Sequence, residues 1–419
     1  MQRNTFIVIL ILLIFFVISF LTNILGPIIP DIVRSFDLSL GLAGFLPFAF
    51  FVAYGVMSIP SGLMVEKFGE KKVLLWAFTI AFFGAFLFAI IPGFSVALLS
   101  LFLIGVGMAM LQVVINPLLR VAGGEEKFAF NSVLAQLFFG AASFLSPLLY
   151  SYLVSSVHSE KSGFIISILN GLVPENLKWV SLYWVFALIA LAMVAVIALI
   201  KFPKVDLNED ERIDVGNSFK ELSANRYVWL FFLGIFAYVG TEQGIANWIS
   251  QFLQTYHGVD PATTGASVIS YFWGLLTVGC FLGLLLLKIF DSRKVLIIFT
   301  SGAVVALLTA LFGSREIALY AFPMTGFFAS VMYSVIFSLA LNSVPNHHGT
   351  FSGILCAGIC GGAVVPLIIG GIGELTGLKL AMLFLFIPLG YILSIGLWAK
   401  PLVNNDTVSN VKELFGSKV

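Results

Sequence analysis

The chain contains few charged residues. Of its 419 residues only 10% are Asp, Glu, Lys or Arg, while 60% are hydrophobic and the mean hydropathy is +1.06. A soluble domain carries about 25% charged residues, so a soluble fold is excluded and most of the surface is expected to face lipid. The 22 basic and 21 acidic residues nearly cancel, which excludes a nucleic-acid partner.

Cysteine and histidine are also scarce. The three cysteines lie inside apolar stretches, and their odd number at membrane depth argues against a disulfide framework. The four histidines fall in predicted loops: His158, His257, His347 and His348. No HExxH or other metal-ligand spacing occurs, and no Ser or Cys lies beside a base within the membrane. A membrane-embedded enzyme is therefore not expected, nor is an organic cofactor.

Long apolar runs are abundant instead. A bilayer core needs about 20 apolar residues per helix, and twelve such runs begin near Thr5, Gly41, Val73, Val96, Phe130, Ser181, Tyr227, Ala262, Val295, Ile317, Gly349 and Leu380. The first run lacks a small-residue cleavage site, so it is expected to remain as a membrane helix. The predicted fold class is an all-α integral membrane protein with twelve transmembrane helices in two six-helix bundles.

A polar interruption divides the runs into two sets of six. We expect an N-terminal bundle at 1–201, a cytoplasmic linker at 202–226 and a C-terminal bundle at 227–419. With the linker and both termini in the cytoplasm, 17 of the 22 Lys and Arg fall inside and five fall outside: Arg34, Lys161, Lys178, Arg315 and Lys379. This asymmetry fits the positive-inside rule. It predicts a multi-pass protein of a bacterial inner membrane.

A similar pattern of glycines and charged residues recurs in both halves. Glycines and charges follow the second helix at Gly62, Glu66, Lys67, Gly69, Lys71 and Lys72, and the eighth at Gly283, Lys288, Arg293 and Lys294. This spacing resembles a loop motif of the major facilitator superfamily. It predicts a conformational clasp between the halves formed by Gly62, Glu66, Lys67, Gly69, Arg120 and Lys288. Alternatively, the individual cations only follow membrane topology.

Polar side chains within spans are few, and they are functional candidates because they are costly in hydrocarbon. The predicted substrate-binding residues are Asn23, Gln112, Asn116, Gln136, Gln243, Asn247, Trp248 and Trp273. Amides both donate and accept hydrogen bonds, as sugar hydroxyls require, and a tryptophan can stack on a sugar ring. The alternatives are interhelical hydrogen bonds for the amides and lipid-facing positions for the tryptophans.

Glu242 is the one carboxylate expected well inside a span. A buried carboxylate either takes up a proton or holds a cation, so we expect Glu242 to be the ion-coupling residue, with a sodium site near it. The alternative is a glutamate hydrogen-bonded to a neighbour for structure alone.

Four segments together resemble the fucose:proton symporter family, including its glucose/galactose branch: GVGMAMLQVVINPLLRVAGG, LAQLFFGAASFLSP, FAYVGTEQGIANW and GICGGAVVPLIIG. The resemblance covers nearly the whole chain and implies uptake of a neutral sugar at a central cavity, driven by an ion, in a carrier that works as a monomer. Fucose carriers use carboxylates where this chain has Gly26 and Gln112. That departure favours ion coupling at Glu242. We expect sugar transport to be driven by sodium, with protons as the second possibility and uncoupled diffusion as the third.

Two other functions remain open from the sequence. A proton-driven exporter of drugs or metabolites has the same fold and also needs a membrane carboxylate, although such sites are more apolar. A sugar sensor that binds without transporting is the second alternative.

Overall fold

Helices form every regular element in the described part of this computed structural model, which comprises residues 5–123, 128–159, 163–200, 217–345 and 347–402. In that part, twelve helical segments are long and apolar enough to cross a membrane. This confirms the predicted fold class. Because successive segments alternate in direction, Thr5 and Trp398 lie at one end of the molecule, called here the terminal end, and the opposite end is called the far end.

The first half contains these elements: α1 (Thr5–Thr22), α2 (Leu25–Phe36), α3 (Leu40–Phe68), α4 (Glu70–Ile90), α5 (Phe94–Gly123), α6 (Phe128–Ser156), α7 (Phe164–Leu172), η2 (Glu175–Val180) and α8 (Ser181–Leu199). Together α1 and α2 form the first span, 32 residues long. The short helix α9 (Asn217–Ala224) lies within the predicted linker. Residues 201–216 lie outside the described residues, so the domain boundaries stay a prediction.

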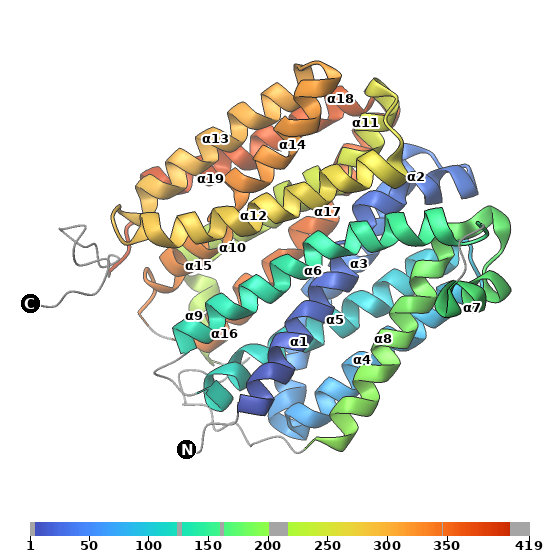
Figure 1. The fold of residues 1–419 in the computed structure, drawn as a ribbon. Coiled ribbons are helices and arrows are strands. Elements are labelled where there is room, and N and C mark those ends of the chain that lie inside the picture. The colour runs from blue at the N-terminus through green and yellow to red at the C-terminus, as the bar shows by residue number, and fades with distance from the viewer. Residues whose placement is uncertain (1–4, 124–127, 160–162, 201–216, 346, 403–419) are drawn as a thin grey trace, which may run out of the picture.

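The second half contains these elements: α10 (Arg226–Ala246), α11 (Ile249–His257), η4 (Pro261–Gly265), α12 (Ala266–Leu287), α13 (Ser292–Phe312), α14 (Arg315–Ala329), α15 (Met332–Leu341), α16 (His348–Ala357), η5 (Gly358–Cys360), α17 (Gly361–Thr376), α18 (Leu378–Ala381), η6 (Met382–Leu385) and α19 (Phe386–Trp398). Figure 1 shows the two halves side by side, with α6 next to α12 and α17 next to α3. The halves meet mainly along these two pairs, and α3 also contacts α16 and η5.

The first span of each half is interrupted at an asparagine. Asn23 and Ile24 separate α1 from α2, and Asn247 and Trp248 separate α10 from α11. In the first half the cause is Pro27, because proline has no backbone N–H to donate to the Asn23 carbonyl four residues earlier and its ring crowds that carbonyl. Interrupted helices in transporters frame the substrate and ion sites near the middle of the membrane.

The two interrupted helices touch each other. A Cβ atom built on Gly26 of α2 would lie 2.3 Å from the carbonyl oxygen of Ala246, the last residue of α10. Only glycine permits this approach, since a real Cβ essentially never comes within 3.0 Å of such an atom. The interruptions of both halves are therefore brought to one level of the bundle.

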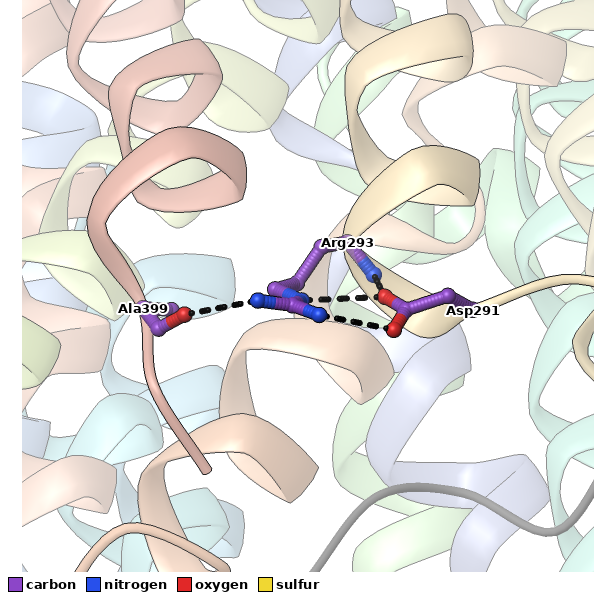
Figure 2. A network of polar contacts seen from close by, with 3 residues as sticks. All are labelled: Asp291, Arg293 and Ala399. Carbon is purple, nitrogen blue, oxygen red and sulfur yellow. Dashed lines mark hydrogen bonds and ion pairs between the residues drawn. The ribbon is translucent and has the colours of Figure 1, made fainter. Parts of the chain in front are cut away.

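Lysine and arginine of the two loop motifs cap the last helix of their own half. Lys71 Nζ donates to the carbonyls of Ala198 and Ile200, both at 2.7 Å, at the end of α8. Figure 2 shows the counterpart, in which Arg293 donates to the Ala399 carbonyl at 3.4 Å, just after α19, and pairs with Asp291 at 2.9 Å. Cations are favourable at helix C-termini, so each motif tightens its own bundle.

The residues predicted to form a clasp between the halves are placed as follows. Lys67 holds its Nζ over the ring of Phe68 at 5.3 Å, and Lys288 is exposed. Gly62 is buried within α3, and Gly69 ends that helix with φ at +81°. The side chains of Glu66 and Arg120 lie outside the described residues. The clasp stays a prediction, whereas the contacts that Lys71 and Arg293 make lie within one half.

Candidate functional site

A chain of hydrogen bonds runs along α10 toward its interruption. Tyr238 donates to one oxygen of Glu242 at 2.6 Å, and the Gln243 amide donates to the other at 3.5 Å. Asn247, one turn further, donates to Gln243 at 3.4 Å. Glu242 is half-buried, while Gln243 and Asn247 are buried. Three of the predicted residues, Glu242, Gln243 and Asn247, are thus linked in one chain of hydrogen bonds, in which Tyr238 and Asn247 each lie one helical turn from their partner.

A second polar cluster lies in the first half. Asn23, buried at the α1–α2 interruption, donates from its amide nitrogen to Ser143 of α6 at 2.9 Å and to Ser19 at 3.3 Å. Ser19 donates to the Phe139 carbonyl at 2.6 Å and lies 2.6 Å from Ser143. The side-chain carbonyl oxygen of Asn23, Oδ1, is buried and has no hydrogen-bond partner. An orphaned buried acceptor is rare enough to require an explanation.

Trp273 on α12, like Asn23, has a buried polar atom without a hydrogen-bond partner. Its side chain is only 3% exposed, its ring packs edge-on against Phe272, and its indole N–H is buried without a hydrogen-bond partner. Trp248 differs, because its indole donates to the Pro366 carbonyl at 3.1 Å and its side chain is fully buried in the second half. In this conformation Trp248 packs within the second half, and stacking of Trp248 or Trp273 on a sugar ring stays a prediction.

We call Asn23, Ser143, Tyr238, Glu242, Gln243 and Trp273 the polar centre. Tyrosines connect its two sides. The Tyr238 ring lies 5.8 Å from that of Tyr333 on α15, which interacts with Cys356 on α16. The Tyr54 hydroxyl of α3 interacts with Thr22 of α1, and Tyr54 also lies near Cys356. Residues of both halves therefore contribute to one polar region.

The remaining predicted residues of the first half are Gln112, Asn116 and Gln136. Gln136 is exposed on α6, one turn nearer to the terminal end than Gly140, where α6 packs on Thr277 of α12. Gln112 is half-buried and takes part in an interaction. The side chain of Asn116 lies outside the described residues. The exposure of Gln136 next to the α6–α12 contact indicates that the halves separate toward the terminal end.

Sequence reasoning missed Tyr238, Ser143, Tyr54 and Tyr333. Tyr238 was detectable, because it precedes Glu242 by one helical turn and a carboxylate inside a span needs a hydrogen-bond donor. The other three join the site through contacts between helices distant in sequence. No spacing along the chain predicts those contacts.

At the far end the halves are joined by a carboxylate. Glu374 of α17 accepts hydrogen bonds from the Ser39 hydroxyl at 2.9 Å and the Gly41 backbone N–H at 3.0 Å. These donors form the N-terminus of α3, where a negative charge is favourable. We call this contact the far-end latch. It joins the two halves at the far end, whereas Gln136 on the terminal side of the α6–α12 contact is exposed.

A separate apolar groove of about 670 Å³ lies between α13 and α14, lined by residues such as Val305, Ala306 and Met324. Its lining includes the hydroxyl residues Ser301, Thr309 and Tyr320 but no amide or carboxylate side chain. Among the described residues no group of three or more His, Cys, Asp or Glu is placed to hold a metal ion. The candidate site therefore remains the polar centre.

The chain belongs to the major facilitator superfamily, because the sequence model of that family matches residues 11–365. It is 30% identical over 399 residues to a glucose/galactose transporter of Brucella abortus, covering 92% of each chain. It is 24% identical to the L-fucose-proton symporter of Escherichia coli K12, over 87% of this chain and 86% of that protein. The predicted family resemblance is confirmed, as is the prediction of a transporter rather than an enzyme.

Solved structures support the same fold. The outward conformation of the fucose:proton symporter superposes with a TM-score of 0.68 at 23% identity, covering 94% of this chain and 98% of that one. A bacterial homologue of the lysosomal transporter Spinster, inward-facing and occupied, superposes with a TM-score of 0.76 at 15% identity, covering 94% and 96%. At these identities the similarity shows the fold.

Proposed function

We propose that this protein takes up a neutral sugar of the hexose class by alternating access, with a cation bound at Glu242 coupled to the sugar. The observation that carries the proposal is the polar centre, in which neutral amides, hydroxyls and one carboxylate from both halves meet beside two interrupted helices. Relatives named as glucose/galactose transporters and L-fucose-proton symporters support a sugar as the cargo.

The surroundings of Glu242 favour a proton as the coupling ion. Its two nearest polar neighbours, Tyr238 and Gln243, present hydrogen-bond donors to the carboxylate. A sodium ion instead requires a shell of oxygen ligands directed at one point. We therefore place the proton first and the sodium ion, which the sequence favoured, second.

We also propose an orientation with both termini in the cytoplasm of a bacterial inner membrane and a protein that works as a monomer. The distribution of Lys and Arg supports this orientation. The conformation is then inward-facing, because the far-end latch is closed and Gln136 is exposed on the terminal side. The clasp residues remain candidates for the contact that forms in the opposite conformation.

Uptake into proteoliposomes tests this proposal. Labelled glucose, galactose and fucose are each supplied under an imposed pH gradient without sodium, and under a sodium gradient at equal pH. The proposal expects concentrative uptake of at least one of the three, driven by the pH gradient. Uptake driven only by sodium would reverse our order of the two ions. Binding of a sugar without flux would indicate the sensor, and uptake of none would refute the sugar assignment.

A further inference from the structure

Two residues of the polar centre each hold a buried polar atom without a hydrogen-bond partner. The Asn23 Oδ1 atom is an acceptor without a donor, and the Trp273 Nε1 atom is a donor without an acceptor, each in a residue at most 4% exposed. A buried polar group left unpaired costs about 1–3 kcal/mol. Two such atoms in one region indicate a ligand that satisfies both.

The orientation of the Asn23 amide is determined by its neighbours. Ser19 and Ser143 have one hydroxyl hydrogen each, and the Phe139 carbonyl and the bond between the two hydroxyls use both hydrogens. Neither serine has a hydrogen left for Asn23, so the amide nitrogen must face the serines. The Asn23 Oδ1 atom therefore points away from α6.

The packing of α12 brings Trp273 to the same level. Ile269, one turn before Trp273, packs against Gly26, and Thr277, one turn after it, packs against Gly140 of α6. Asn23 lies three residues before Gly26 and binds Ser143, three residues after Gly140. Trp273 therefore lies at the level of Asn23, between the contacts that α12 makes with the first span and with α6.

Contacts of α12 with Phe144 of α6 also place Trp273 at the level of Asn23. Ser270 of α12 donates to the Phe144 carbonyl at 2.6 Å, and a Cβ on Gly274 would lie 2.9 Å from the Phe144 ring. Ser143 precedes Phe144, and Trp273 precedes Gly274, so the Asn23–Ser143 pair and Trp273 flank one contact between the halves.

We propose that Asn23 and Trp273 together hold one hydroxyl of the transported sugar, which donates its hydrogen to Asn23 Oδ1 and accepts a hydrogen from Trp273 Nε1. This inference rests on the sugar assignment proposed above and adds which residues select the substrate. A hydroxyl both donates and accepts. A carboxylate is repelled by Asn23 Oδ1, and an ammonium cannot accept from Trp273, so the pair selects a neutral polyol over charged substrates.

Single-deoxy analogues of the transported hexose test the pairing. Uptake of each analogue is measured in proteoliposomes of the full-length protein and of the variants Trp273→Phe and Asn23→Ala. In the wild type, the analogue lacking the held hydroxyl should lose about 10-fold to 100-fold in kcat/KM. Each variant should lose a comparable amount with the parent sugar, and removal of that hydroxyl should then cost it little more.

Trp248→Phe is the matched control, because it removes an indole hydrogen bond to the Pro366 carbonyl rather than an unpaired donor. It should leave the ranking of the analogues unchanged. The inference is overturned if each analogue loses the same factor in Trp273→Phe as in the wild type, or if the two variants become insensitive to different hydroxyls. Because Trp273→Phe keeps an aromatic ring, it tests the pairing even if Asn23→Ala fails to fold. A wild type that carries no sugar refutes the sugar assignment and this inference with it.

Discussion

Gly26 shows how the absence of one side chain permits a close contact between the two halves. The resemblance to fucose carriers implies a carboxylate at this position, and here any side chain would collide with the Ala246 carbonyl. The missing carboxylate is thus accompanied by a direct contact between the two interrupted helices. The sequence predicted the departure but not its structural consequence.

Gly26→Ala should therefore destabilise the present conformation by about 1–3 kcal/mol, the usual range for an overpacked site. We expect slower transport, because the far-end closed conformation is less populated. Uptake rate and thermal unfolding measure the effect. Gly371→Ala on α17 is the control, since its added Cβ meets nothing within 4 Å. Equal effects of the two substitutions would contradict the role of the close contact.

The candidate site was partly predictable from single residues. Asn23, Gln243 and Glu242 stood out because polar side chains are rare in these spans, and all three lie in the polar centre. Trp248 and Trp273 looked alike in sequence, yet only Trp273 has an unpaired indole N–H. Which partner a buried indole finds depends on a distant helix, here α17 for Trp248, so sequence spacing could not separate the two.

At the scale of elements, the loop motifs connect each bundle to its own last helix. Arg293 holds the pKa of the Asp291 carboxyl below its usual value through hydrogen bonding and charge, although burial opposes the shift. A lowered folded-state pKa means that this pair stabilises the fold above the unfolded pKa of about 3.9. The contribution is lost as the pH falls through the lowered folded-state value.

Asp291→Asn should accordingly lower the thermal unfolding temperature at pH 7 by a small amount. The pair is partly exposed, so we expect roughly 0.2–1 kcal/mol. The difference from wild type should begin to shrink below about pH 4, where the Asp291 carboxylate of the unfolded chain becomes protonated, and it should be lost once the pH is below the lowered folded-state pKa. Lys288→Met, at an exposed cation outside the pair, provides the comparison. A difference that stays constant from pH 7 to pH 3 would argue against the ion pair.

The far-end latch joins α17 to the N-terminus of α3, and it involves no residue of the predicted clasp. Glu374→Gln should weaken it by about 1 kcal/mol, since it removes a charge at a helix N-terminus. The fraction of molecules open at the far end should then rise about fivefold.

Spin labels at the exposed residues Leu42 and Leu375 report this change as a longer distance between the halves. Glu316→Gln, an exposed acidic residue elsewhere at the far end, should leave the distance distribution unchanged. An unchanged distribution in Glu374→Gln would show that the latch does not hold the far end closed.

At the scale of the whole molecule, the twelve spans and their two bundles followed from hydropathy alone, because a bilayer requires apolar segments of a set length. The interruption of the first span was not predicted, although Pro27 in the sequence is its cause. Contacts between the halves, such as Gly26 on Ala246, could not be predicted either. They belong to one conformation of a protein that must adopt at least two.

We propose that Glu242, the carboxylate of the polar centre, couples sugar movement to a cation gradient. For one proton per sugar, a gradient of about one pH unit supports about tenfold accumulation, since 1.4 kcal/mol is a factor of ten. The most direct measurement is the accumulation ratio in proteoliposomes of the wild type and of Glu242→Gln. The account predicts accumulation by the wild type, and only equilibration, with sugar exchange retained, by the variant. Equal accumulation by both proteins would contradict it.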